Sequence, residues 1–283
     1  MATEICRLVG EQFPPLLREI PHVPTTLFLR GSLPPSHYKL LAVVGSRKMS
    51  TYGKEACQHI IHGLSGYPIS IVSGLALGID GVAHRAALHA KLHTIAVPGS
   101  GLDDSVLYPS SHRALARDIL KSGGALVSEE EPHFRARPES FPKRNRVMAG
   151  MSHATLVIEA GEKSGTMITA RLALDYNRDL LCVPHSLFAE GGAGGHVYMK
   201  LGAMPVRSAG DIIELFEFEK KEIAAQTVSE PENRVLNILS EPLQRDELIR
   251  SLKLPISEAN ALLLGMELKG LIKETLGEVR RMG

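Results

Sequence analysis

The sequence predicts an α/β fold: an extended Rossmann-like, doubly wound and mainly parallel sheet, followed by a small C-terminal winged-helix domain. Short runs rich in Val and Ile, each ending in Gly, Ser or Pro, recur from "LAVVG" to "LLCVP". Stretches with helical spacing, such as "YGKEACQHIIHGLSG", separate these runs. Apolar strands that alternate with helices indicate a parallel sheet covered on both faces. In the tail, three helical pieces precede two short strands around Gly277, which is the winged-helix pattern.

The composition sets limits on function. The chain has 283 residues, of which 44% are hydrophobic and 22% charged, typical of a soluble protein of about two domains. Lys plus Arg number 32 and Asp plus Glu 31, so any anion site must be a local patch. Cys6, Cys57 and Cys182 lack metal-ligand spacing. We therefore expect reduced thiols, a cytoplasmic protein without a signal peptide or membrane span, and neither metal nor cofactor.

The elements follow in chain order. Residues 1–37 are rich in proline and predict an extension, in which "TTLFLRG" forms one short strand or a packed arm. Residues 38–217 form the Rossmann-like domain. Its expected strands are "LAVVG", "ISIVSG", "HTIAVPG", "GALVSE", "ATLVIEA" and "LLCVP". Residues 218–231, polar and containing Pro231, predict a helix end and a linker, and residues 232–283 form the winged-helix domain.

Four turns that follow predicted strands are candidates for binding an anion. Ligands of open parallel sheets bind beyond the carboxyl ends of the strands. Glycine lets the backbone approach a ligand, helix N-termini offer free N–H groups, and an arginine adds a charge-assisted donor. Tight turns also need glycine for structural reasons alone, but several on one sheet edge favour an anion site. The turns are Gly45-Ser46-Arg47, Ser73-Gly74, Gly99 and Ser164-Gly165-Thr166.

Several enzyme classes lack support in the sequence. The chain contains no G-x-x-x-x-G-K-[ST], and no G-x-G-x-x-G follows the first strand, so a P-loop and a dinucleotide site are disfavoured. Asp80, His84 and Glu159 could be assembled into an acid–base site. A structural role is the better interpretation, with Asp80 capping the helix on which His84 lies.

The segment "SFPKRNRVMAG" concentrates positive charge. Five cations, Arg135, Arg137, Lys143, Arg144 and Arg146, accompany one anion, Glu139, between positions 135 and 146. Pro138 and Pro142 predict an extended segment before a helix, and Phe141 lies among the cations. Cations that track phosphates and a ring that stacks a base are typical of a single-stranded nucleic-acid groove. For Phe141 the alternative, an anchor in the core, stays open.

These motifs together resemble the DprA/Smf family, DNA-processing protein A. The resemblance covers about Leu27 to Phe216 and is most specific in "FPKRNRVMAGMSHATLVIEAGEKSGTMITA". It implies a homodimer that binds single-stranded DNA, protects incoming strands and helps load recombinase A during natural transformation, the DNA uptake of competent cells. The resemblance implies no catalytic activity. Arg47 matches the family's phosphate-holding arginine. The basic motif maps to Phe141, Lys143, Arg144, Asn145 and Arg146. His112, Pro184-His185 and Ala86 depart from the family pattern, and the N-terminal part is short.

Two further interpretations complete the prediction. From Glu232 onward eight cations balance eight anions, and the expected recognition helix, about Ile256 to Lys269, is largely apolar. We therefore expect an auxiliary or protein-binding winged helix rather than a strong DNA binder. The alternatives to a DNA-binding mediator are a phosphoribohydrolase-like nucleotide enzyme and a nucleotide-regulated docking protein. Against the enzyme, "GEKSGT" has no glutamate four or five residues on.

Overall fold

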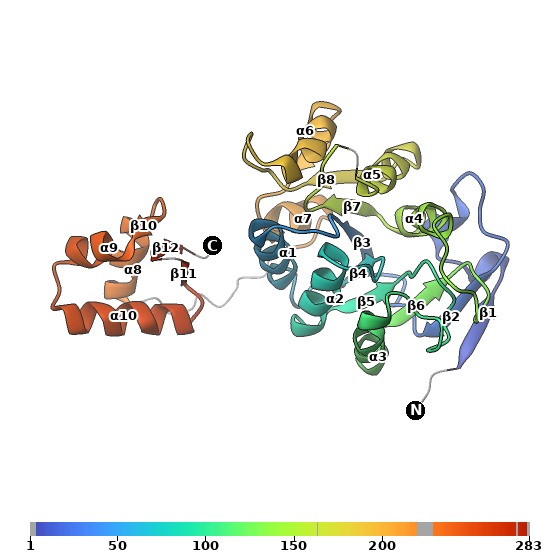
Figure 1. Ribbon diagram of the computed structural model, residues 1–283, viewed down its shortest axis with the longest axis horizontal. Coiled ribbons are helices and arrows are strands. Elements are labelled where there is room, and N and C mark those ends of the chain that lie inside the picture. The colour runs from blue at the N-terminus through green and yellow to red at the C-terminus, as the bar shows by residue number, and fades with distance from the viewer. Residues whose placement is uncertain (1–3, 163, 220–228, 276, 282–283) are drawn as a thin grey trace. The chain divides into compact units, whose positions relative to one another are not determined.

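The computed structural model describes residues 4–162, 164–219, 229–275 and 277–281 (Figure 1). The chain divides into two compact units, Met1–Lys220 and Lys221–Gly283. Most of the linker predicted at 218–231, namely residues 220–228, lies outside the described residues. Among the described residues no helix is both long and apolar enough to cross a membrane.

The first unit is built on a nine-stranded sheet in the order β1-β2-β6-β5-β4-β3-β7-β8-β9. Neighbouring strands among β3 to β9 pair in parallel, whereas β1 and β2 add an antiparallel edge next to β6. All six strands predicted for this domain form, as β3 to β8. The strands are β1 (Ile5–Leu8), β2 (Leu27–Gly31), β3 (Lys39–Val44), β4 (Ile69–Ser73), β5 (His93–Ala96), β6 (Ala125–Ser128), β7 (Ala154–Val157), β8 (Asp179–Cys182) and β9 (Met204–Pro205).

Helices cover both faces of this sheet, as the apolar strands require (Figure 1). Leu41 and Val43 of β3 pack in one core with α1, α2 and α7, while Ala42 and Val44 pack in the other with α4, α5 and α6. The helices are α1 (Thr51–Gly63), α2 (Ile79–His89), α3 (Arg113–Lys121), α4 (Ser140–Met151), α5 (Thr166–Asp175), α6 (Ala193–Lys200) and α7 (Ala209–Leu215), with short 3₁₀ helices at Gly10–Gln12, Pro15–Arg18, Ser110–His112 and Glu190–Gly192.

The first 37 residues belong to the same compact unit as the large domain. The "TTLFLRG" segment supplies β2, which pairs with β1 on one side and β6 on the other. Between these strands, Phe13, Leu17 and Ile20 are buried in the core beneath α4. The proline-rich composition therefore excludes long helices here but not packing, because the apolar residues between the prolines reach the core.

Helix α4 begins earlier than the sequence predicts. The prolines of "PESFPK" indicate an extended segment, yet the helix starts at Ser140 and includes Pro142 in its first turn. Proline is tolerated there because the N–H groups of the first turn have no intrahelical acceptor. The consequence is that Phe141, Lys143, Arg144 and Arg146 all lie on one helix and point in directions set by its 3.6-residue turn.

The second unit has the predicted winged-helix elements. Its helices are α8 (Glu230–Ile238), α9 (Arg245–Leu252) and α10 (Ile256–Leu268), and its sheet has the order β10 (Leu243–Gln244), β12 (Glu278–Arg281), β11 (Ile272–Thr275). Helix α8 starts two residues before the boundary predicted at 232, and Pro231, taken as part of a linker, lies in its first turn. The Glu232 carboxylate accepts from the Ser229 N–H at 2.8 Å, a capping box that fixes this start.

Candidate functional site

A pocket of about 500 Å³ lies at the carboxyl end of β3, between the β3–α1 loop, α4 and the start of α5. This is the edge at which open parallel sheets bind ligands. The pocket brings together nine of the fourteen site residues that the sequence predicts. They are Gly45, Ser46, Arg47, Phe141, Arg144, Asn145, Ser164, Gly165 and Thr166.

The β3–α1 loop is a fixed platform for Arg47. The Ser46 N–H donates to the Glu159 carbonyl at 2.8 Å, and the Ser46 carbonyl accepts from the Ile79 N–H at 3.1 Å. Gly78, with φ of 79°, allows the start of α2 to lie against this loop, because a Cβ there would be 2.7 Å from the Arg47 Cα. The Arg47 side chain is exposed, and no carboxylate of the described residues lies within 4.0 Å of its guanidinium.

Arg144 forms the buried positive charge of the pocket. Its side chain is buried, its Nη1 donates to the Val97 carbonyl, and its Nε has no partner among the described residues. Removal from water lowers the Arg144 pKa to about 10, opposed by the nearby Asp80 carboxylate. Gly74 makes room for both groups, because a Cβ there would lie 2.5 Å from Asp80 Oδ2 and from the Arg144 guanidinium carbon. An anion in this pocket would find a desolvated donor already in place.

Phe141 is half buried beside the pocket. Its ring packs against Gly99, where a Cβ would approach to 2.6 Å, and the Arg47 guanidinium carbon lies 5.1 Å from the ring centroid. Tyr108, which the sequence analysis missed, lies on another side with ring centroids 5.7 Å apart. Phe141 is therefore a contact surface at the edge of the pocket and not a wholly buried anchor.

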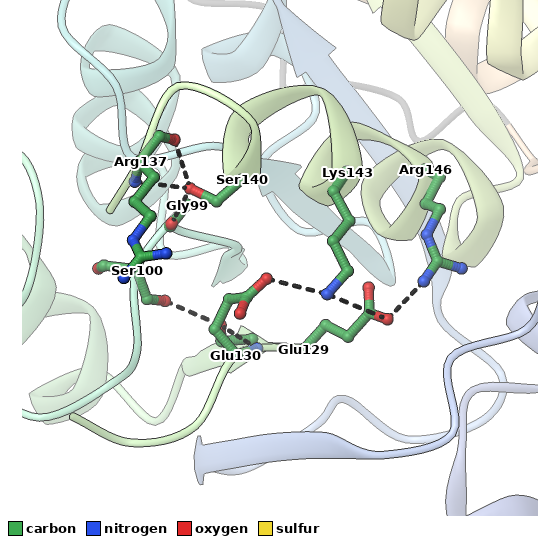
Figure 2. Close-up of polar contacts among 9 residues, drawn as sticks. Gly99, Ser100, Glu129, Glu130, Arg137, Ser140, Lys143 and Arg146 are labelled. Atoms are coloured by element: carbon green, nitrogen blue, oxygen red, sulfur yellow. Dashed lines mark hydrogen bonds and ion pairs between the residues drawn. The ribbon is translucent and has the colours of Figure 1, made fainter. Parts of the chain in front are cut away.

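Lys143 and Arg146 point away from the pocket. Figure 2 shows both side chains directed toward Glu129 and Glu130, which follow β6. Lys143 Nζ lies 3.0 Å from Glu130 Oε1 and 3.7 Å from Glu129 Oε1, and Arg146 Nη2 lies 2.5 Å from Glu129 Oε1. The predicted row of cations is thus divided by the helix, and only Arg144 of the three lines the pocket.

The remaining predicted residues have structural positions. Ser73 is wholly buried, and its hydroxyl donates to the Val43 carbonyl at 2.7 Å. Gly99 is buried beneath Phe141, and its carbonyl accepts from the Ser140 hydroxyl at 2.5 Å (Figure 2). Gly74 lines a second, smaller hollow beside the pocket. These residues shape the site from below, and Ser73 is turned away from it.

The candidate acid–base residues are engaged inside the fold. The N-cap of α2 is Gly78, so Asp80 is not the cap that the sequence predicts. Its carboxylate accepts instead from the Ala76 N–H at 3.3 Å, and burial raises the Asp80 pKa. Burial also lowers the His84 pKa to about 3, and His84 Nδ1 lies 2.8 Å from the Thr94 hydroxyl. Glu159 accepts from the N–H of Ser50, which caps α1, at 3.0 Å.

Sequence reasoning missed three parts of the site. Lys48 lines the pocket and directly follows Arg47, so including the residue after the Gly45-Ser46-Arg47 turn would have found it. Glu129 and Glu130 lie just outside the window in which the cations were counted. Tyr108 carries no charge and follows a loop, so only its proximity to Phe141 in space shows its relevance.

Comparison with known proteins identifies relatives of both units. A family model described as DNA recombination-mediator protein A matches residues 4–217, and one described as DprA winged helix domain matches residues 219–278. Protein Smf of Escherichia coli is 40% identical over 209 residues, which are 74% of this chain but only 55% of that protein. DNA processing protein DprA of Streptococcus pneumoniae is 37% identical over 211 residues, 75% of this chain and 73% of that one.

Solved structures agree with these matches. The X-ray structure of DNA processing protein A from Streptococcus pneumoniae superposes with a TM-score of 0.69 at 35% identity, covering 77% of this chain and 76% of that chain. The Helicobacter pylori DNA processing protein A, described for its single-stranded DNA binding mode, superposes with a TM-score of 0.66 at 26% identity, covering 77% of this chain and 100% of that chain.

Proposed function

The chain belongs to the DNA recombination-mediator protein A family, and from this premise we propose that it binds single-stranded DNA and helps to load recombinase A onto it during natural transformation. We propose that it acts as a cytoplasmic homodimer and protects the incoming strand. One observation carries the DNA-binding part of this proposal. An exposed Arg47 that forms no ion pair among the described residues and a buried Arg144 with an unpartnered Nε line the same pocket.

The pocket chemistry fits a phosphate of the DNA backbone. Two guanidinium groups supply charge-assisted donors, and the N-terminus of α5, where Ser164 and Gly165 lead into Thr166, adds the positive end of a helix dipole. None of these groups distinguishes one base from another, so the proposed binding is independent of sequence. Lys143 and Arg146 remain predicted phosphate contacts, which require release from Glu129 and Glu130.

We propose a binding role and not hydrolysis of nucleotides. Asp80 is the carboxylate among the described residues lining the pocket, and its oxygen is held by the Ala76 amide. Glu159, the other acid of this edge, is held by Ser50. Incubation with a panel of nucleoside monophosphates should release no free base. Turnover would favour the phosphoribohydrolase-like alternative.

Binding of a labelled oligothymidine, measured by fluorescence anisotropy at several salt concentrations, tests the proposed site. Arg47→Ala should weaken binding and reduce the slope of log affinity against log salt by about 0.7, the value for one lost phosphate contact with a single strand. Arg18→Ala, which removes an exposed arginine from the 3₁₀ helix at Pro15–Arg18, is the matched control and should change neither quantity. Equal effects of the two substitutions would contradict the assignment.

A further inference from the structure

A second hollow adjoins the pocket and differs from it in chemistry. The two share Arg47, Ala76 and Phe141, so they meet along the edge where Arg47 lies over the Phe141 ring. The pocket presents guanidinium groups and a helix terminus, whereas the hollow presents mainly aromatic and aliphatic side chains. The hollow is lined by Arg47, Gly74, Ala76, Leu77, Tyr108, Pro109 and Phe141.

Tyr108 and Leu77 expose unusual apolar area at this place. Tyr108 is 49% exposed and Leu77 is 50% exposed, although both line the same hollow as the half-buried Phe141 ring. The ring of Tyr108 projects from a fixed backbone. Leu107 before it is 2% exposed, the Tyr108 N–H donates to the Ser100 hydroxyl at 3.3 Å, and the Pro109 carbonyl accepts from the His112 N–H at 3.0 Å.

Phe141 is less available than Tyr108 to a flat ligand. Gly99 packs against the Phe141 ring, and the Arg47 guanidinium lies over it at 5.1 Å, a cation–π distance. Phe141 therefore positions Arg47. The Tyr108 ring is tilted by 54° to Phe141, and its hydroxyl has no hydrogen-bond partner among the described residues. Its surface is the aromatic one left open beside the two arginines.

We propose that Tyr108, supported by Leu77, is a base-stacking subsite for the nucleotide whose phosphate Arg47 and Arg144 hold. A nucleotide joins an anionic phosphate to an apolar ring within one residue, which matches a charged pocket that meets an aromatic hollow. Stacking on an aromatic ring accepts every base, because each base has a π face. This subsite rests on the proposed function and replaces Phe141 by Tyr108 as the stacking ring.

A single introduced tryptophan tests the subsite directly. The chain contains no Trp, so Tyr108→Trp provides a single tryptophan, which can be excited at wavelengths where the remaining tyrosines do not absorb. The probes are an oligothymidine and an abasic sugar–phosphate oligomer of the same length. Tryptophan fluorescence should be quenched by oligothymidine and unchanged by the abasic oligomer. Tyr108→Ala should weaken oligothymidine binding by about 5- to 150-fold, the range for loss of one stacked base, without changing the salt slope.

Controls separate stacking from folding and from the proposed function. Tyr108→Phe keeps the ring and should bind oligothymidine like the wild type, and Tyr108→Ala should bind the abasic oligomer like the wild type. The subsite would be overturned, with DNA binding left intact, if Tyr108→Ala lost affinity equally for both probes. It would also be overturned if Tyr108→Trp bound oligothymidine without quenching and Tyr108→Ala bound it without loss. If the wild type binds neither probe, the proposed function fails and the subsite fails with it.

Discussion

The two sides of helix α4 carry the same kind of charge in opposite situations. Arg144 on one side is buried at the pocket, donates to a main-chain carbonyl and keeps an unpartnered Nε. Lys143 and Arg146, three residues apart on the other side, are paired with Glu129 and Glu130 (Figure 2). Neighbours in the sequence therefore differ by about 100° in direction. The number of cations in a segment overstates the charge that it offers to a ligand.

The largest expected effect comes from removing the buried charge. Arg144→Ala should lower the free energy of unfolding by about 3 kcal/mol, because Asp80 would remain buried without its nearby cation. It should also weaken binding of oligothymidine at least tenfold. All six tyrosines lie between residues 38 and 198, so tyrosine fluorescence during urea unfolding reports on the first unit.

Lys143→Ala is the matched control for that experiment. Its side chain is 46% exposed, whereas those of Glu129 and Glu130 are 14% and 17% exposed, and Glu129 keeps its pair with Arg146. The stability change should therefore be about 1 kcal/mol, smaller than that of Arg144→Ala. Equal losses of stability in Lys143→Ala and Arg144→Ala would contradict the proposed energetic difference between the two sides of α4.

Releasing Lys143 and Arg146 from their carboxylate partners should strengthen DNA binding, the opposite of the effect of Arg144→Ala. Glu129→Gln removes the carboxylate shared by Lys143 and Arg146. We expect oligothymidine affinity at low salt to rise about 3- to 10-fold, with a log–log salt slope steeper by about 0.7 for each cation that reaches a phosphate. Glu139→Gln, an exposed acid in the residue before the same helix, should produce a smaller rise without a steeper slope. An unchanged Glu129→Gln variant would place Lys143 and Arg146 outside the path of the strand.

The buried floor next to Arg144 should make stability depend on pH. The His84 pKa is lowered to about 3, so between that pH and about 6.5 the unfolded chain binds a proton that the folded chain excludes. Acidification from pH 7 to pH 5 should therefore destabilise the first unit, with His84 contributing up to about 1.4 kcal/mol per pH unit below 6.5. Asp80, whose pKa burial raises, acts in the opposite direction, because the folded chain keeps its proton at pH values above 3.8 where the unfolded chain has lost it.

Comparison of variants isolates the histidine from other titrating groups. His84→Gln should flatten the dependence of the urea midpoint on pH, since it removes the buried imidazole beside Thr94. His89→Gln, which changes an exposed histidine on the same helix, should leave the dependence as in the wild type. A slope unchanged by His84→Gln would show that other groups dominate.

The sequence could predict the strands and the edge of the sheet where the pocket lies, because both follow from local patterns. The runs that became β3 to β8 are mostly apolar, and the turns after β3 and before α5 carry Gly and Ser. Directions of side chains were not predictable in the same way. Whether Arg144 or Lys143 faces the pocket depends on where α4 begins, and Pro142 pointed to a later start. The pairing of Arg146 with Glu129, 17 residues away, depends on how the loop between β6 and α4 folds back, which no local pattern reveals.

The winged helix extends the same lesson and should show the smallest effect. Arg245 pairs with Glu274, and Lys269 Nζ lies 2.7 Å from Glu232 Oε1, so part of its positive charge is neutralised within the unit. Helix α10 exposes Leu264 and Leu268, as its apolar composition predicts, but Leu263 and Met266 of the same helix are buried in the core of this unit.

Two of this unit's exposed cations can be tested in the full chain. Arg234→Ala combined with Arg250→Ala removes two exposed arginines of α8 and α9. We expect oligothymidine affinity to change by less than about twofold. The salt slope should stay constant, because the proposed phosphate contacts lie in the first unit and this variant keeps them. A drop in slope of about 1.4, two contacts' worth, would mean that the winged helix holds the strand as well. The exposed leucines of α10 would then be a surface beside a DNA contact, and the distinction between a binding unit and an auxiliary unit would no longer hold.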